Sequence, residues 1–163
     1  MSHPNRPHDV SFPFSWRFLQ TGWRLLFFNQ GDWRDDPKQS AAYNRGGYLV
    51  EALSHCQECH TPRNPLGGLD RSKPFAGTPH GPEGVLVPNI TPDPETGIGN
   101  WGKDDLAQML KTGETPEFST VAKSMGEAID DGLKYLTEED RAAIATYILA
   151  QKPIRNAVRA AGK

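Results

Sequence analysis

The chain has 163 residues, 36% of them hydrophobic, and a formal net charge of −2 at pH 7. This length allows one globular domain with a modest core and is short for two. The near-neutral charge gives no support for nucleic-acid binding, which needs a basic stripe. Glycine and proline are abundant, with 16 and 14 residues, so we expect much irregular structure between helices.

Residues 12–28 form the most apolar stretch of the chain. Polar or helix-breaking residues interrupt it and exclude a membrane span: Pro13, Arg17, Gln20 and Arg24. From Ser15 onward the periodicity predicts a helix with one apolar face, made of Trp16, Leu19, Trp23, Leu26 and Phe27. Something must cover this face. Packing against the chain's own body or a neighbouring domain is the favoured interpretation, and a membrane-surface helix is the alternative.

A second helix is predicted over residues 41–53, although it contains Gly46 and Gly47. Each glycine costs roughly 1 kcal/mol of helix stability relative to alanine. Such a pair indicates that another element approaches closely. We expect the C-terminal helix to cross here, with Tyr147 over the gap.

The remainder of the chain predicts one long loop and two helices. Residues 61–102 are rich in proline and glycine. A loop of this length is expected to be functional or to pack closely against another part of the molecule or a bound group. A short helix follows over 103–113 and stops at Gly113. The last helix begins at Thr137 and ends before Pro153, with an apolar stripe made of Leu136, Ile144, Tyr147 and Ile148. The predicted class is mostly α with long loops.

Both cysteines lie in the motif SHCQECH, residues 54–60. On a helical turn, Cys56 and Cys59 project their thiols to the same side, and His60 follows directly. C-x-x-C-H is the attachment motif of c-type haem, in which two thioethers tether the porphyrin and the imidazole binds the iron. We therefore predict one covalent haem c held by Cys56, Cys59 and His60. His55 is expected to face elsewhere.

Three other uses of the cysteine pair are less favoured. A zinc site needs four ligands and would have to recruit His55 or His80. A thioredoxin-like dithiol belongs in a βαβ context that the sequence does not offer. A disulfide between cysteines this close in sequence has poor geometry and leaves His60 without a role.

A metal-bound histidine usually donates its second ring nitrogen to an oxygen, which strengthens the imidazole as a ligand. For His60, the carbonyl of Pro62 or of Pro65 is the expected acceptor. The sequence does not decide between the two.

The chain resembles class I cytochrome c domains, specifically those of multi-haem cytochrome c subunits of membrane-bound alcohol, gluconate and aldehyde dehydrogenases. The matching stretches are NRGGYLVEALSHCQECHTPRNPLGGLD (44–70), PNITPDPETGIGNW (88–101), LAQMLKTG (106–113) and LTEEDRAAIATYI (136–148). The resemblance implies an all-α class I cytochrome c fold, with long Pro/Gly-rich loops around one covalent haem and an N-terminal arm. We divide the chain into an arm or linker at 1–40, a cytochrome c domain at 41–153 and a C-terminal tail at 154–163.

The first 40 residues resemble the segment that links successive haem domains in such proteins, yet no C-x-x-C-H precedes it in this sequence. We expect a fragment of a larger cytochrome, with a single-haem relative as the alternative. The stretch MSHPNRPHDV lacks the apolar core and cleavage site of a secretory signal. Because haem of this kind is attached outside the cytoplasm, the resemblance implies a periplasmic location.

The sixth iron ligand is expected to be a methionine thioether, as in cytochromes c. Met125 lies in a loop-like stretch before the last helix, where the family places this ligand. Met109 lies on the apolar face of its helix, where a core role is favoured. Met125 is the predicted ligand, and the alternatives are Met109, His80 or a vacant position.

Four further residues are candidate haem contacts. Asn89, Thr91 and Trp101 match the family's string and are candidates to contact a propionate or the haem edge. The alternatives are turn formation for Asn89 and Thr91 and core filling for Trp101. Arg63 is a candidate partner for a propionate, or else a solvated loop residue.

A haem with His and Met ligands has no open position for a substrate, and no catalytic triad or phosphate loop accompanies the motif. We predict a one-electron carrier between a dehydrogenase or quinol and a downstream acceptor, as a non-catalytic part of an oxidoreductase complex. The alternative is a haem enzyme with an open sixth position that acts on peroxide or a sulfur compound. Expected partners are a dehydrogenase subunit or another haem domain. Peripheral membrane association is compatible with the sequence.

Overall fold

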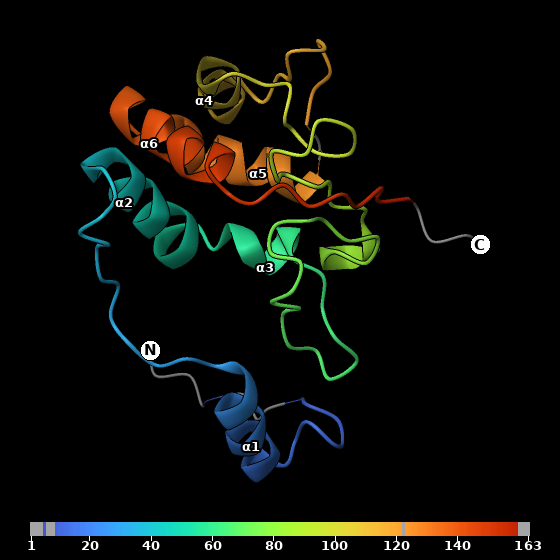
Figure 1. Cartoon of the computed structure of the whole chain (residues 1–163). Coiled ribbons are helices and arrows are strands. Elements are labelled where there is room, and N and C mark those ends of the chain that lie inside the picture. The colour runs from blue at the N-terminus through green and yellow to red at the C-terminus, as the bar shows by residue number, and fades with distance from the viewer. Residues whose placement is uncertain (1–4, 6–8, 122, 160–163) are drawn as a thin grey trace. The chain divides into compact units, whose positions relative to one another are not determined.

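The computed structural model describes residues 5, 9–121 and 123–159, so residues 160–163 of the predicted tail lie outside the described part. The chain divides into two units, Met1–Asp32 and Trp33–Lys163 (Figure 1). Regular structure in the described residues is helical. Extended residues there pair only in isolated bridges, Arg63–Leu69, Thr78–Val87 and Glu114–Thr120. The predicted helical class is therefore confirmed.

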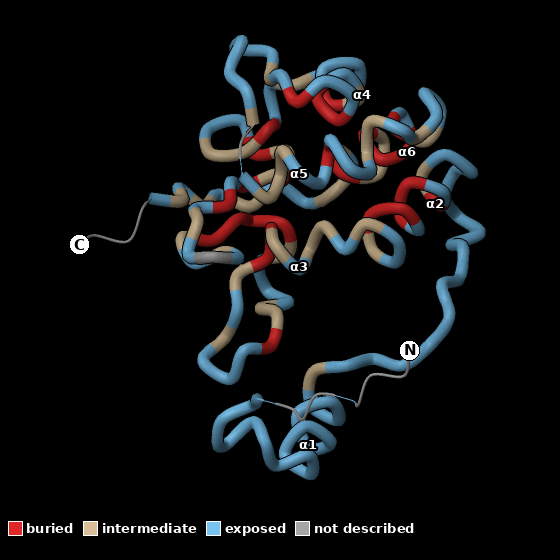
Figure 2. Tube along the Cα trace, turned by 180° about the vertical axis from the view of Figure 1, so that it is seen from behind, coloured by how far each residue is buried: buried red, intermediate tan, exposed pale blue. Residues whose placement is uncertain are grey.

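The described residues of the first unit form the helix α1 (Arg17–Phe27), which begins two residues after the predicted start. No residue of α1 is buried, and Figure 2 shows the unit almost entirely as exposed chain. Among the helices that the structure describes, none combines the length and the apolar character needed to cross a membrane.

The second unit begins at Trp33, earlier than the predicted boundary at residue 41. Asp36 and Asn44 join the intervening segment to the first helix of the unit. The backbone N–H of Asp36 donates to Asn44 Oδ1 at 2.9 Å, and Asn44 Nδ2 donates to the Asp36 carbonyl at 2.9 Å. Residues 33–40 are thus part of the domain in the structure.

The helices of the second unit are short, and the longest loops among the described residues are 61–81 and 85–102. The helices are α2 (Ala41–Gly47), the π-helix η1 (Tyr48–Leu53), α3 (Cys56–His60), the 3₁₀-helix η2 (Pro82–Gly84), α4 (Lys103–Thr112), α5 (Lys123–Asp131), the 3₁₀-helix η3 (Leu133–Tyr135) and α6 (Glu138–Leu149). The helix predicted over 41–53 is present, with a π-helical second half. The prediction of a loop-like stretch around Met125 is wrong, because this residue lies in α5.

Helices α2 and α6 cross in close contact at the predicted glycine pair (Figure 1). A Cβ atom on Gly46 would lie 2.0 Å from the carbonyl oxygen of Ala143, and one on Gly47 would lie 3.0 Å from Tyr147 Cε2. The Trp33 ring also approaches this glycine, since its Cη2 atom would lie 2.6 Å from the same Cβ position on Gly47. The prediction that the last helix crosses here with Tyr147 over the gap is confirmed.

Polar contacts fix the start of α6. Thr137 caps the helix, because its hydroxyl accepts the backbone N–H of Asp140 at 3.2 Å. The Asp140 carboxylate then receives two hydrogen bonds from the Arg45 guanidinium on α2, at 2.7 and 2.8 Å. Asp140 therefore takes part both in the N-terminal cap of α6 and in the contact between α2 and α6.

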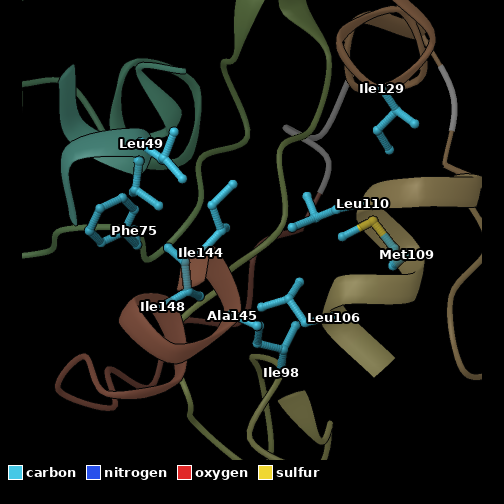
Figure 3. Packing of buried hydrophobic residues seen from close by; sticks show 11 residues of the cluster. Leu49, Phe75, Ile98, Leu106, Met109, Leu110, Ile129, Ile144, Ala145 and Ile148 are labelled. Carbon is cyan, nitrogen blue, oxygen red and sulfur yellow. The ribbon is translucent and has the colours of Figure 1, made fainter. Parts of the chain in front are cut away.

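The core lies where α6 contacts α4 and η1 (Figure 3). Its buried members come from η1, α4, α5, α6 and the long loop: Leu49, Val50, Phe75, Ile98, Leu106, Met109, Leu110, Ile129, Ile144, Ala145 and Ile148. Met109 points into this cluster beside Leu106 and Leu110, as expected for a core methionine. The long loop contributes Phe75 and Ile98, so it is part of the folded body.

Candidate functional site

The C-x-x-C-H motif forms the short helix α3, which follows directly after η1. Between these two helices His55 adopts a left-handed backbone conformation, with φ of 50°. His55 is exposed, whereas Cys56 and Cys59 are half-buried and His60 is buried. Both thiols are free. One helical turn thus carries two thiols and an imidazole at the spacing that the motif requires.

His60 has one ring nitrogen occupied and the other available. Its Nδ1 lies 2.9 Å from the carbonyl oxygen of Pro88. A carbonyl can only accept, so Nδ1 carries the proton. Burial lowers the pKa of His60 against the opposing effect of this hydrogen bond, which favours the neutral ring. The neutral ring has its lone pair on Nε2, the atom that can bind a metal.

The acceptor expected for His60 was the carbonyl of Pro62 or Pro65, and this prediction is wrong. The acceptor is Pro88, 28 residues away. The contact depends on Gly77, whose φ is +78° and whose backbone N–H donates to the His60 carbonyl at 2.6 Å. A Cβ atom on Gly77 would lie 2.6 Å from the carbonyl carbon of Pro88. Gly77 therefore allows the Pro88 segment to approach the histidine.

Sequence reasoning missed Gly77 and Pro88 as parts of the site. Pro88 directly precedes the NITPD string, so the family match was the signal that could have pointed to it. Gly77 has no comparable local signal, because many glycines surround it in the loop.

Cys56 packs against the hydrophobic core. Burial raises the pKa of its thiol to about 11, and the nearby Glu51 carboxylate adds to this effect. Cys56 is therefore protonated at neutral pH. A neutral thiol is a poor metal ligand, since metals bind the thiolate.

Glu51 connects the motif region to α6. It accepts a hydrogen bond from the Tyr147 hydroxyl at 3.0 Å and another from the Gln57 side-chain amide. Burial raises the pKa of Glu51, and the Tyr147 hydrogen bond partly opposes this effect. The α2–α6 crossing and the C-x-x-C-H helix thus share one polar network.

Asn89 and Thr91 are buried and hold the start of the C-terminal tail. Asn89 Nδ2 donates to the carbonyl of Ile154 at 2.8 Å, and the backbone N–H of Ile154 donates to Thr91 Oγ1 at 3.1 Å. Asn89 Oδ1 also accepts the Thr91 backbone N–H at 2.9 Å, which makes an Asx turn. The turn role considered for both residues is present, and their proposed contact with a haem stays a prediction.

Arg63 is exposed, with its guanidinium 2.5 Å from a Glu58 carboxylate oxygen and 2.8 Å from the Gly67 carbonyl. It borders a hollow of about 280 Å³ next to Cys59, and His80 lies on the same hollow. This arrangement brings a guanidinium and an imidazole to the second cysteine. A propionate contact of Arg63 remains a prediction.

Trp101 is half-buried against the core, and its Nε1 donates to Glu117 at 3.0 Å. Met125 is also half-buried against the core, as is Cys56. The candidate sixth ligand and the first attachment cysteine therefore border the same cluster. Of the other ligand candidates, Met109 is buried in the core and His80 is exposed.

The described side chains do not favour a zinc site. Within residues 5, 9–121 and 123–159, no three His, Cys, Asp or Glu side chains converge in a way that would hold a metal ion. A site built from the cysteine pair with His55 or His80 has no geometric support in this part of the chain. The neutral Nε2 and two free thiols do match the donor set that a covalent haem needs.

Comparisons with known proteins agree with this donor set. The chain is 41% identical over 145 residues to a "Diheme cytochrome c-type" of Cereibacter sphaeroides, covering 88% of this chain and 47% of that protein. It is 41% identical over 146 residues to the fructose dehydrogenase cytochrome subunit of Gluconobacter japonicus, covering 89% and 29%. The cytochrome c subunit of the quinone alcohol dehydrogenase of Gluconacetobacter polyoxogenes is 31% identical over 161 residues, covering 94% and 34%.

The chain spans less than half the length of each of these relatives. No family model matches it. The similarity covers nearly all of the chain and includes the C-x-x-C-H helix and the loop that orients its histidine. The chain is therefore homologous, at 28–41% identity, to a diheme cytochrome c and to the cytochrome c subunits of fructose, alcohol and gluconate dehydrogenases.

Proposed function

We propose that this chain is a one-electron carrier with one covalent haem c, tethered by Cys56 and Cys59 and ligated by His60 and Met125. The observation that carries the proposal is the buried His60 ring, whose Nδ1 donates to Pro88 and whose Nε2 is left as a neutral donor beside two free thiols. When bound, the haem supplies an iron that alternates between Fe(III) and Fe(II).

The residues of the chain have distinct tasks in this proposal. Pro88 orients the His60 ring and increases its donor strength, because a ring N–H that donates to a carbonyl makes the opposite nitrogen more basic. Met125 would close the sixth position and raise the reduction potential. The number of haems follows from the cysteines, since the sequence has only two and one covalent haem c uses both.

The names of the relatives bear on the electron donor. Several are cytochrome subunits of dehydrogenases, and we propose that a dehydrogenase is also the partner of this chain. A periplasmic location fits the proposal, because c-type haem is attached there.

Two matched substitutions test the ligand assignment. The chain is expressed with export and haem maturation, and Met125→Leu is compared with Met109→Leu, which changes a core methionine in the same way. Met125→Leu should remove the charge-transfer band of the Met–Fe(III) bond, allow the reduced protein to bind carbon monoxide, and lower the potential. Met109→Leu should keep the band and cost less than about 1.5 kcal/mol of stability.

Two results would contradict the proposal. Rapid carbon monoxide binding by the unmodified reduced protein would indicate an open sixth position and would favour a haem enzyme. Loss of the band in Met109→Leu with its retention in Met125→Leu would assign the ligand to the core methionine instead.

A further inference from the structure

The α1 helix has a wide apolar face. At 100° per residue, its apolar side chains cover roughly 200° of the circumference, and the remaining arc holds Arg17, Gln20, Thr21 and Arg24. None of the eleven residues is buried, and Leu25 and Leu26 are 82% and 72% exposed. An apolar surface of this width needs a partner or an apolar medium.

Aromatic residues before the helix enlarge this surface. The Phe12 ring packs on Trp16 with centroids 5.1 Å apart, and Trp16 packs on Phe18 at 5.4 Å. Phe12 and Phe14 are 69% and 68% exposed. Tryptophan and phenylalanine are typical of the boundary between lipid headgroups and acyl chains.

The charge of this segment has one sign. Residues 10–31 contain Arg17 and Arg24 and no acidic residue, although the whole chain has a net charge of −2. Both arginines lie on the polar arc, and the Arg24 guanidinium stands 5.4 Å from the centroid of the Phe28 ring. A basic polar arc opposite an aromatic and leucine-rich face is complementary to anionic headgroups above an acyl layer.

The dimensions of α1 favour a helix that lies along such a surface. Eleven residues span only about 16 Å, which is too short to cross a hydrocarbon core about 30 Å thick. The apolar arc is also about twice the minimum width of about 100° that a surface helix needs to pack on a protein core. A lipid surface accepts the wider arc, because acyl chains adapt to the shape of the helix.

We propose that α1, together with Phe12, Phe14 and Trp16, binds the surface of a membrane that contains anionic lipids and lies in the plane of its headgroups. The inference does not depend on the haem, because it rests on residues outside the C-x-x-C-H domain.

Vesicle sedimentation tests this inference with the full, haem-loaded chain. Vesicles of phosphatidylcholine alone are compared with vesicles that also contain phosphatidylglycerol, and the pelleted protein is measured on a stained gel, so the readout is independent of haem chemistry. The chain should pellet with the anionic vesicles, and added salt should weaken binding. Arg17→Gln/Arg24→Gln should weaken it about 25-fold, since each basic residue near such a surface contributes about 1 kcal/mol and 1.4 kcal/mol is tenfold.

A matched pair separates the apolar face from charge. Leu26→Asp and Thr21→Asp change the net charge equally, but only Leu26 lies on the apolar arc. Thr21→Asp should reduce affinity about fivefold, and Leu26→Asp at least about tenfold further, because it also removes leucine burial. Equal losses, or no binding to anionic vesicles, would overturn the proposal. The proposal would also be overturned if the chain did not bind vesicles but formed a dimer that Leu26→Asp abolishes. The apolar face of α1 would then be an interface with a second copy of the chain.

Discussion

The two units of the chain use apolar residues in opposite ways. In the second unit, α6 buries Ala143, Ile144 and Ala145 in succession, so neighbours cover several sides of this helix. In the first unit, α1 separates its apolar and polar residues more clearly, yet none of its residues is buried. A periodic apolar face therefore predicts that a helix forms and which of its sides is removed from water. Whether that side is buried by the chain itself depends on elements elsewhere in the chain or on a partner outside it.

The largest expected effect is at the crossing of α2 and α6. In Gly46→Ala the new Cβ atom would lie 2.0 Å from the Ala143 carbonyl oxygen, and a backbone atom cannot move aside cheaply. We expect the free energy of unfolding to fall by at least about 4 kcal/mol, or the domain to fail to fold. Urea denaturation followed by circular dichroism measures this change.

Gly22→Ala is the matched control in the first unit. Gly22 lies within α1, and nothing is within 4 Å of its Cβ position. The same substitution should leave the unfolding of the domain unchanged and favour the α1 helix by up to about 1 kcal/mol. If both variants behaved alike, the close approach of α2 and α6 would be disproved.

Core packing gives the next largest effect. Leu106→Ala removes a side chain that is 4% exposed on α4, whereas Leu25→Ala removes one that is 82% exposed on α1. The first change should cost about 2–5 kcal/mol, because it leaves a cavity in the core. The second should change domain stability by no more than about 0.5 kcal/mol. Denaturation midpoints of the two variants decide this, and a similar loss in both would mean that the domain buries Leu25 in solution.

The features predicted correctly from sequence have strong local causes. Gly46 and Gly47 lower the stability of a helix, and the close approach of another element explains their presence. This reasoning predicted that the last helix crosses at the glycine pair with Tyr147 over it. Thr137 and Gly113 are a preferred N-cap and a preferred stop, and both act as predicted. The C-x-x-C-H spacing likewise predicted one helical turn, and α3 is that turn.

The features missed from sequence depend on contacts between distant residues. Helix α5 carries Gly126 in its interior and Asp130 and Asp131 at its C-terminal end, where acidic residues oppose the helix dipole. It is anchored by Ile129, which is buried in the core. The His60 acceptor was sought nearby, but a carbonyl 28 residues away is brought to the ring by the fold of the loop. Local helix and turn propensities carry no information about either of these long-range contacts.

The smallest expected effect concerns a polar contact of the domain. Tyr147→Phe keeps the ring over the glycine pair but removes the hydroxyl that donates to Glu51 at 3.0 Å. Burial already raises the pKa of Glu51 in the folded state, and the Tyr147 hydrogen bond lowers it, so the variant should raise it further. Below the unfolded pKa of about 4.3, Glu51 is protonated in both states. As the pH rises above this value the unfolded chain ionises first, so the free energy of unfolding falls until the pH has passed the folded pKa.

Tyr147→Phe should therefore match the unmodified chain most closely near pH 4 and be less stable by about 1–2 kcal/mol at pH 7, where an ionised, half-buried Glu51 has lost a donor. Unfolding free energies measured between pH 4 and pH 8 show the difference. Tyr43→Phe is the control, because its ring also packs on Tyr147, with centroids 4.9 Å apart, and the Glu51 hydrogen bond is kept. A loss that is constant with pH would show that the hydroxyl stabilises the crossing without acting on Glu51.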